Sequence, residues 1–127
     1  ILYMLGYDVF LELSYRQLIE EGKSVEEAYW ALVVKDIQDA CKLFHGIYQE
    51  SKGEDGYVSV EVSPKLAHET EDTIEAAKWL HRVVQQPNVH IKIPATAECI
   101  QSIKTVISLG ISVNVTVSFL MMKNIAQ

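Results

Sequence analysis

A lysine, Lys92, stands in the middle of a largely apolar stretch of the sequence. Val89, Ile91 and Ile93 alternate along this stretch, so in a β-strand they share one face and Lys92 points from the other. Pro94 cannot donate to a strand ladder and therefore predicts the end of the strand. Lysine is almost never fully buried unless it has a partner or a task, so Lys92 is the first candidate for chemistry.

Two further stretches, residues 57–64 and 111–119, show the same alternation. Valines occupy every second position of each stretch, and polar residues occupy the positions between them. Each pattern predicts a β-strand with one valine face and one polar face. Glu61 on the first of these strands, and Asn114 and Thr116 on the second, therefore join Lys92 as candidate site residues.

These four side chains suit the chemistry of a Schiff base. Desolvation disfavours the ammonium form of a lysine, and the neutral amine of Lys92 can attack a ketone carbonyl. The resulting imine is an electron sink, so a neighbouring carbon–carbon bond can break or form. Glu61 is suited to the proton shuttling that dehydration of the carbinolamine needs. Asn114 and Thr116 could orient a substrate hydroxyl and a catalytic water.

Helical patterns separate the three strands. We expect Thr70 or Asp72 to cap the first helix and Thr96 to cap the second. In the second helix we expect four apolar residues to form the inner face: Ile100, Ile103, Val106 and Ile107. Strands that alternate with helices predict a parallel sheet joined by right-handed crossovers.

The polar face of such a sheet needs an explanation. In an antiparallel sheet it would simply face water, but parallel sheets are usually covered on both faces. Buried polar groups must be paired or have a function. A closed α/β barrel resolves this, because the valine faces meet the helices and the polar residues line the top of the interior.

Residues 1–52 are predicted to be mainly helical and residues 53–127 to form a β-α-β-α-β segment. Residues 24–27 form a Ser-x-x-Glu capping box that opens a helix, and a second helix start is expected at 35–36. Residues 6–8 suggest a turn within an apolar opening stretch that shows no clear period.

Composition excludes several classes of function. The net charge is −6, and Arg16 and Arg82 are the only arginines, which argues against nucleic-acid binding. No apolar run is long enough to span a bilayer, and the opening residues are a poor signal peptide. Cys41 and Cys99 show neither metal nor redox spacing, so we expect both to be reduced and buried in a cytoplasmic protein.

The three strands also resemble a known family. Residues 58–64 and 66–74 look like the third strand and the following helix of bacterial transaldolases. Residues 88–96 look like their Schiff-base strand, and residues 110–116 look like their fifth strand. The similarity is greatest to the branch that includes fusions with glucose-6-phosphate isomerase. It covers about residues 18–119, and the three motifs together are highly specific.

This resemblance implies a (β/α)8 TIM barrel that works in the pentose phosphate pathway. It would transfer a dihydroxyacetone unit from sedoheptulose 7-phosphate to glyceraldehyde 3-phosphate, with sugar phosphates as its partners. By the family pattern Lys92 is the Schiff-base lysine, and Glu61 is the acid/base that acts through a water. Thr116 helps to hold that water, and Asn114 contacts the bound dihydroxyacetone. The resemblance implies neither a cofactor nor a metal.

The sequence also departs from the family pattern. The first-strand aspartate, the second-strand asparagine and the later phosphate-binding residues have no counterpart, and residues 1–15 match poorly. Only strands three to five of the eight are expected, so the chain resembles the middle of a transaldolase. Such a segment has open sheet edges, and we expect it to be inactive alone and to self-associate.

Two other functions stay open at this point. The chain could belong to another class I Schiff-base aldolase, or it could be a truncated, inactive barrel that acts only as an assembly module. For Lys92 itself, the simpler alternative is a structural lysine at a strand end whose amine reaches solvent. We expect His90 to be a hydrogen-bonded core residue and His68 to lie on the surface.

Overall fold

The computed structural model describes the backbone of residues 2–116 and the side chains of residues 10–116. The chain divides into two compact units, residues 1–36 and 37–127, and the boundary falls inside a long helix. No helix among the described residues is both long and apolar enough to cross a membrane.

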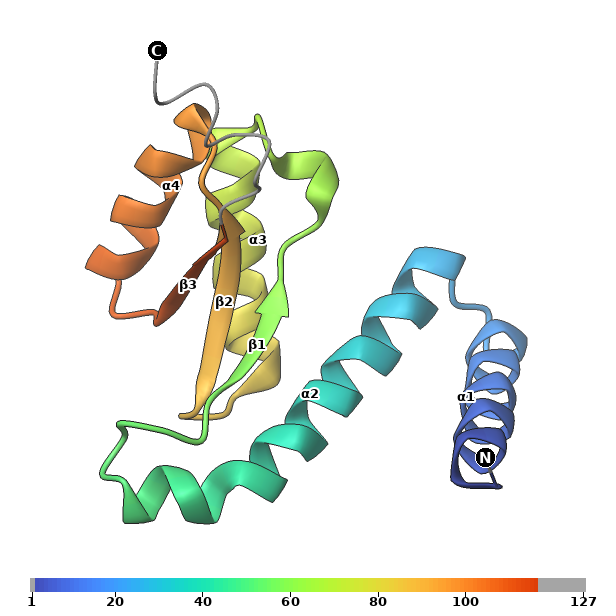
Figure 1. The fold of residues 1–127 in the computed structure, drawn as a ribbon. Helices are drawn as coiled ribbons and strands as arrows, with labels where there is room; N and C mark the ends of the chain where they lie inside the picture. The colour runs from blue at the N-terminus through green and yellow to red at the C-terminus, as the bar shows by residue number, and fades with distance from the viewer. Residues whose placement is uncertain (1, 117–127) are drawn as a thin grey trace. The chain divides into compact units, whose positions relative to one another are not determined.

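The first unit contains helix α1, Leu2–Glu20, and the beginning of helix α2, Val25–Glu50 (Figure 1). The turn expected at residues 6–8 is wrong, because α1 runs through these positions without a break. A single glycine inside a helix costs only about 1 kcal/mol relative to alanine, which the surrounding helix formers offset. The helix ends before Gly22, whose φ of 85° is left-handed backbone that glycine adopts at low cost.

Helix α2 opens with the predicted capping box. The Ser24 hydroxyl accepts from the backbone N–H of Glu27 at 3.2 Å, and the Glu27 carboxylate accepts from the backbone N–H of Ser24 at 2.8 Å. The carboxylate also accepts from the Ser24 hydroxyl at 2.7 Å, and the bonds from the Ser24 backbone N–H and then from its hydroxyl lower the pKa of Glu27 because they favour the carboxylate form. The second helix start expected at residues 35–36 is wrong, since α2 continues to Glu50. An acidic residue mid-helix resembles a helix start in sequence, but it also fits an exposed helix face.

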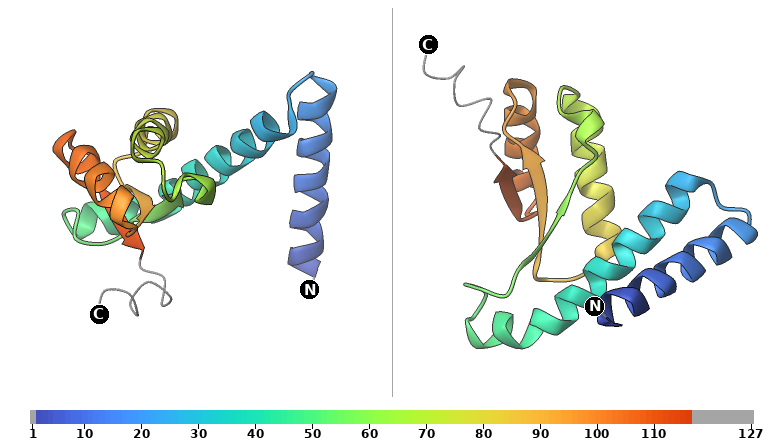
Figure 2. Two further views of the ribbon diagram at one scale, coloured as in Figure 1. Left: turned by 90° about the horizontal axis from the view of Figure 1, so that it is seen from above. Right: turned by 45° about the vertical axis from the view of Figure 1, so that its right-hand side comes forward.

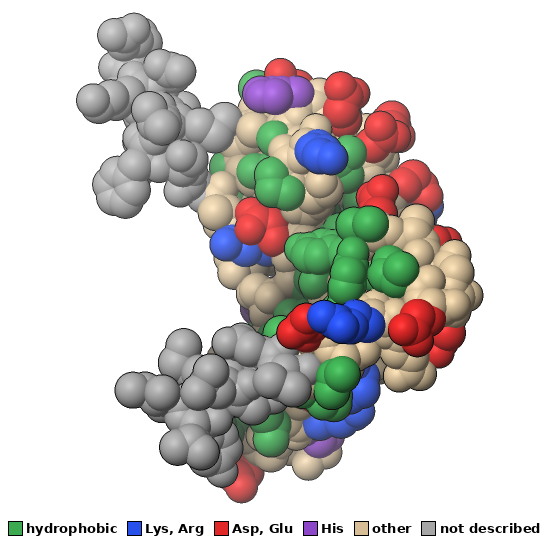
Figure 3. Space-filling model, turned by 90° about the vertical axis from the view of Figure 1, so that its right-hand side faces the viewer, with side chains coloured by type: hydrophobic (Ala, Val, Ile, Leu, Met, Phe, Trp, Pro, Cys, Tyr) green, Lys and Arg blue, Asp and Glu red, His purple; other side chains and the backbone are tan. Residues whose placement is uncertain are grey.

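The first unit exposes several large apolar side chains. Figure 3 shows one face of the molecule, on which several hydrophobic side chains lie together with charged side chains around them. In α1 and the opening of α2 the exposed apolar residues are Phe10, Leu13, Ile19, Val25 and Tyr29. Single exposed apolar side chains are normal on a protein surface, whereas a contiguous apolar patch usually marks a contact surface.

The second unit contains a parallel three-stranded sheet in the order β1-β2-β3. Its strands are β1, Val58–Glu61, β2, Val89–Pro94, and β3, Val113–Thr116. Helix α3, Thr70–Val84, and helix α4, Ala97–Ser108, connect them and cover one face of the sheet (Figures 1 and 2). The predicted parallel α/β arrangement is confirmed for these strands. The part of the third predicted strand beyond residue 116 lies outside the described residues.

The hydrophobic core lies between the sheet and these two helices. Every second residue of β2 is buried, which confirms the inward face predicted from the alternation. The sheet contributes Val60, Val62, Val89, Ile91 and Ile93, and the helices contribute Ile74, Ala77, Leu80, Val84 and Val106. Burying side chains of this size stabilises the fold by about 1.5–3 kcal/mol each, before the loss of conformational entropy.

The helix ends differ in part from expectation. The Thr96 hydroxyl caps α4 by accepting from the backbone N–H of Cys99 at 3.1 Å, as predicted. In α3 the capping position is Glu69, and neither Thr70 nor Asp72 takes it. The hydroxyl of Thr70 instead donates to the Glu98 carbonyl at 3.0 Å, so the start of α3 is tied to α4 by tertiary contact.

The inner face expected for α4 is only partly correct. Val106 is buried, but Ile100 and Ile107 are 50% and 55% exposed. The buried positions include Cys99 and Ser102, which lie one turn apart and face α3. The small side chains on this inner face allow α4 to pack close to α3. Sequence periodicity alone does not reveal such packing.

Asn88 ties the last part of α2 to the sheet. Its side-chain amide is fully buried and donates to the carbonyls of Cys41 at 2.9 Å and Gly56 at 2.8 Å. Gly56 is required here, because a Cβ at this residue would lie 2.5 Å from the backbone nitrogen of Tyr48. Cys41 and Cys99 are both free and buried, as predicted.

Candidate active site

The strand register brings three of the four predicted site residues into one row. Glu61 on β1 pairs with Lys92 on β2, and Lys92 pairs with Asn114 on β3. Paired residues of a parallel sheet point to the same side. Ile91 and Ile93 are buried under the helices, so the row lies on the opposite, polar face.

Lys92 and Glu61 form the centre of this row. The Lys92 amine lies 3.6 Å from a carboxylate oxygen of Glu61, and the two side chains are 34% and 44% exposed. The two groups form an ion pair, but their separation is too long for a good hydrogen bond. A water beside the pair could accept from the amine and donate to the carboxylate at the same time.

Asn114 is held by a residue that the sequence reasoning did not single out. Its side-chain amide donates to the hydroxyl of Ser59 at 3.0 Å. Ser59 is on β1 and Asn114 is on β3, so the bond crosses over β2. Neighbouring strands lie about 4.8 Å apart, so the two side chains reach toward each other across two strand spacings. Ser59 lies two residues before Glu61 and therefore points to the same face of β1. This alternation is the signal in the sequence that could have identified Ser59.

Thr116 lies beyond Asn114 on the same face of β3 and pairs with Pro94. Within the described part of the chain, its buried hydroxyl has no hydrogen-bond partner. Buried polar groups are nearly always satisfied by protein or water. This hydroxyl is therefore placed to bind a water or a ligand group at the carboxyl ends of the strands.

Side-chain hydrogen bonds fix the loops that follow β1 and β2. The Thr96 hydroxyl donates to the Ala67 carbonyl, and the Thr73 hydroxyl donates to the Leu66 carbonyl at 2.9 Å. The Ser102 hydroxyl donates to the Thr70 carbonyl at 2.9 Å. The bond from Thr73 thus holds the 3₁₀ turn Pro64–Leu66, which follows Glu61, against α3. The bond from Thr96 holds Ala67, the residue after this turn, against the start of α4.

His68 and His90, two of the four histidines, differ in exposure and in their partners. His68 is 72% exposed, as predicted, and its Nδ1 lies 3.3 Å from the Glu98 carboxylate. The Glu98 carboxylate accepts a hydrogen bond from the backbone N–H of Glu98 itself, and this bond lowers the pKa of Glu98 most. The hydrogen bond from the His68 side chain lowers it further. His90 shares the Lys92 face and stacks on Tyr57 with ring centroids 3.9 Å apart. Burial lowers the pKa of His90 because it disfavours the charged imidazolium.

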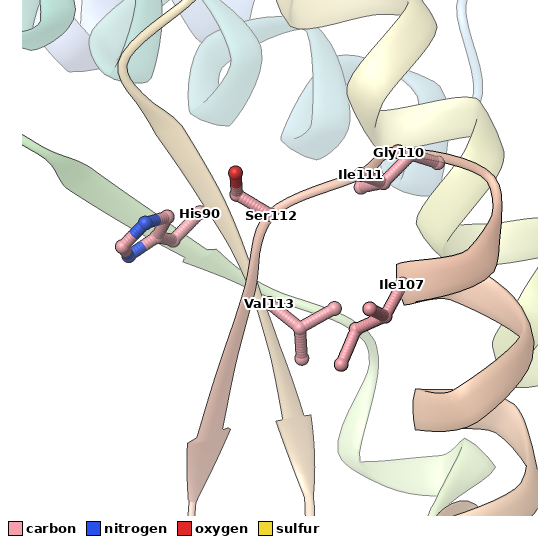
Figure 4. A pocket seen from close by; sticks show the side chains of 6 residues that line it. All are labelled: His90, Ile107, Gly110, Ile111, Ser112 and Val113. Atoms are coloured by element: carbon pink, nitrogen blue, oxygen red, sulfur yellow. The ribbon is translucent and has the colours of Figure 1, made fainter. Parts of the chain in front are cut away.

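A separate hollow of about 410 Å³ lies at the amino ends of β2 and β3. It is lined by His90 and Ile107 and by residues 110–113 (Figure 4). Ile107 and Val113 point toward one another in this view, and His90 lies on the other side of the strand. Lys92 is not among the lining residues, so this hollow is distinct from the row of site residues.

Comparison with known proteins identifies the family. The family model for transaldolase/fructose-6-phosphate aldolase matches residues 1–126. The chain belongs to this family. It is 48% identical over 110 residues to a transaldolase of Renibacterium salmoninarum, covering 84% of this chain and 29% of that protein. It is 46% identical over 113 residues to a transaldolase of Trichodesmium erythraeum, covering 89% of this chain and 29% of that protein.

A third relative, transaldolase 2 of Streptomyces coelicolor, is 44% identical over 114 residues, which cover 90% of this chain and 30% of that protein. This transaldolase-family chain therefore spans less than a third of the length of the curated relatives it matches. Among the described residues, no three His, Cys, Asp or Glu side chains form a group that could hold a metal ion.

Proposed function

We propose that the complete protein is a transaldolase that moves a dihydroxyacetone unit from sedoheptulose 7-phosphate to glyceraldehyde 3-phosphate. The products are erythrose 4-phosphate and fructose 6-phosphate, and the enzyme acts in the pentose phosphate pathway of the cytoplasm. The observation that carries this proposal is the pairing of Lys92 with Glu61 on neighbouring strands, 3.6 Å apart, in a chain of this family.

We place the three strands in a (β/α)8 barrel as strands three to five. Helices α3 and α4 cover one face of the sheet, and the other face is polar. Parallel sheets are covered on both faces, and a barrel covers the polar face with its own opposite wall. Val115 on β3 is 46% exposed, which fits a strand whose neighbouring element lies beyond the described residues.

The first chemical step is formation of the Schiff base. The Lys92 amine adds to the C2 carbonyl of the ketose to give a carbinolamine, which loses water to form an iminium. Glu61 moves the protons for this dehydration through a water that binds beside the carboxylate and the amine, which lie 3.6 Å apart. The Thr116 hydroxyl helps to hold this water, in line with its lack of a partner among the described residues.

The second step breaks a carbon–carbon bond. A base of the complete barrel takes the proton of the C4 hydroxyl, the C3–C4 bond breaks, and the bonding electrons move into the iminium to form an enamine on Lys92. Erythrose 4-phosphate leaves as the aldehyde. The enamine carbon then attacks the aldehyde of glyceraldehyde 3-phosphate, whose oxygen takes a proton back from the same base. Water hydrolyses the new iminium to release fructose 6-phosphate and the free Lys92 amine. Asn114 contacts the dihydroxyacetone unit throughout, which its place beside Lys92 allows.

The alternative is a fructose-6-phosphate aldolase, which the description of the matching family also includes. The two activities differ in the fate of the enamine. An aldolase protonates it and releases free dihydroxyacetone, whereas a transaldolase keeps it until an acceptor aldehyde arrives. The names of the curated relatives favour transaldolase.

A transfer assay on the complete protein tests this proposal. With both sedoheptulose 7-phosphate and glyceraldehyde 3-phosphate present, we expect steady formation of erythrose 4-phosphate. With fructose 6-phosphate alone, we expect at most one equivalent of released glyceraldehyde 3-phosphate for each active site. Continuous release of dihydroxyacetone without an acceptor would instead establish an aldolase.

A further inference from the structure

We propose that Ser59 is a positioning residue that orients the Asn114 side chain toward the substrate. This inference rests on the proposed function, because Asn114 is the residue assigned there to contact dihydroxyacetone. The bond between Asn114 Nδ2 and Ser59 Oγ is 3.0 Å long and joins the two outer strands of the sheet.

The strand register places this bond beside the reacting amine. Ser59 pairs with His90, and Asn114 pairs with Lys92, so the bond crosses β2 between these two positions. Glu61 lies two residues after Ser59 on the same strand and the same face. Asn114 is therefore the direct strand neighbour of Lys92, and Ser59 lies on the same polar face one row of residue pairs away.

The bond fixes which end of the amide meets the substrate. An asparagine amide has two N–H donors and one carbonyl acceptor, and rotation about its last bond exchanges them. When Nδ2 donates to Ser59, Oδ1 must point away from β1. It is then available to accept from a hydroxyl of the bound dihydroxyacetone unit. The Ser59 oxygen accepts in this bond, so its own proton remains available for donation.

The two residues are poorly placed for a purely structural role. Ser59 is exposed and Asn114 is only half-buried, and neither is part of the hydrophobic core. In the complete barrel the opposite wall would cover this face, so thermal unfolding of each variant accompanies the kinetics. Because the bond adds nothing to the hydrophobic core, we expect its loss to appear mainly in substrate binding and turnover.

The test is a double-mutant cycle in the complete protein, with Ser59→Ala, Asn114→Ala and the double variant. We expect Ser59→Ala to lower kcat/KM for the ketose about three- to tenfold, the loss typical of one hydrogen bond. The same substitution should have almost no further effect in the Asn114→Ala background, because its only partner in this role is gone. Ser59→Thr keeps the hydroxyl and should restore most of the activity.

Ser112→Ala serves as the matched control, since Ser112 is an exposed serine on the approach to β3 outside the row of site residues. It should leave kcat/KM unchanged. Should Ser59→Ala lower the melting temperature strongly, Ser59→Cys fills the same space with a weak acceptor and should show the same kinetic loss.

Three results would overturn the inference. One is unchanged kcat/KM in Ser59→Ala, and another is an equal loss in both backgrounds of the cycle. In both cases, continued trapping of the ketose on the enzyme by borohydride would leave the transaldolase proposal standing. Failure of the unaltered protein to trap the ketose would overturn both the proposed function and the role of Ser59.

Discussion

Glu61 and Lys92 show how much of a site can depend on two residues. Their types and strand positions were readable from the sequence, because alternation placed both on polar faces. Their separation of 3.6 Å was not, since it depends on the register between β1 and β2. The role of Ser59 was hidden for the same reason, because its partner Asn114 is 55 residues away in the sequence.

At this scale Glu61→Gln is expected to slow catalysis without loss of the fold. The amide has nearly the same shape as the carboxyl group, but it cannot shuttle protons, and such groups contribute about 10²–10⁴-fold. Stopped-flow measurement of Schiff-base formation would show the loss, and thermal unfolding would check the fold. Unchanged turnover would mean that Glu61 is only a polar neighbour of Lys92.

His90 makes the stability of the fold depend on pH. Burial holds its folded-state pKa below the ordinary value of 6.5, so the unfolded state binds the proton more tightly. The contribution of neutral His90 to the free energy of unfolding is therefore fully present above the pKa of the unfolded state. It is lost as the pH falls toward the pKa of the folded state. Urea unfolding at about pH 7.5 and about pH 5.5 should show lower stability at the acid value.

The matched variant for this effect is His90→Phe, which keeps a ring to stack on Tyr57 but does not titrate. It should reduce the loss of stability between the two pH values. An unchanged pH dependence in the variant would show that other groups cause the loss.

At the scale of elements, local signals were reliable where local chemistry decides. The Ser24 capping box, the Thr96 cap and the three strands follow from hydrogen bonding and alternation within a few residues. The signals failed where distant packing decides. The continuous α1 and the exposed Ile100 and Ile107 could not be predicted, because periodicity shows that a face is apolar but not what covers it.

Thr96 links two elements, and Thr96→Val tests that link. The substitution keeps the shape but removes the cap on Cys99 and the bond to the Ala67 carbonyl. We expect a loss of about 1–2 kcal/mol in the free energy of unfolding. Thr105→Val on the same helix is the control. Equal unfolding curves for the two variants would show that the Thr96 hydroxyl contributes little.

At the scale of the whole molecule, the described sheet has two outer strands. β1 and β3 each pair with β2 alone among the described residues, so each presents unpaired backbone groups at its other edge. The polar face that carries Lys92 and Glu61 is not covered by α3 and α4, which pack on the opposite face of the sheet. A barrel in the complete protein would close both the edges and this face.

The 127-residue chain studied alone should therefore not catalyse the transfer. Without an opposite wall its lysine is wetter, and without further binding groups the carbonyl is poorly positioned. The open edges should also cause self-association, which sedimentation velocity over a range of concentrations would reveal. Turnover by a monodisperse monomer of this chain would contradict this expectation.

The central claim, that Lys92 is the nucleophile, is tested most directly by mapping the covalent adduct. The complete protein is reduced with borohydride in the presence of fructose 6-phosphate, digested and sequenced by mass spectrometry. We predict an adduct on Lys92 that is lost in Lys92→Ala and retained in Lys104→Ala, which removes an exposed lysine of α4. An adduct on a different lysine, or one that persists in Lys92→Ala, would contradict the account.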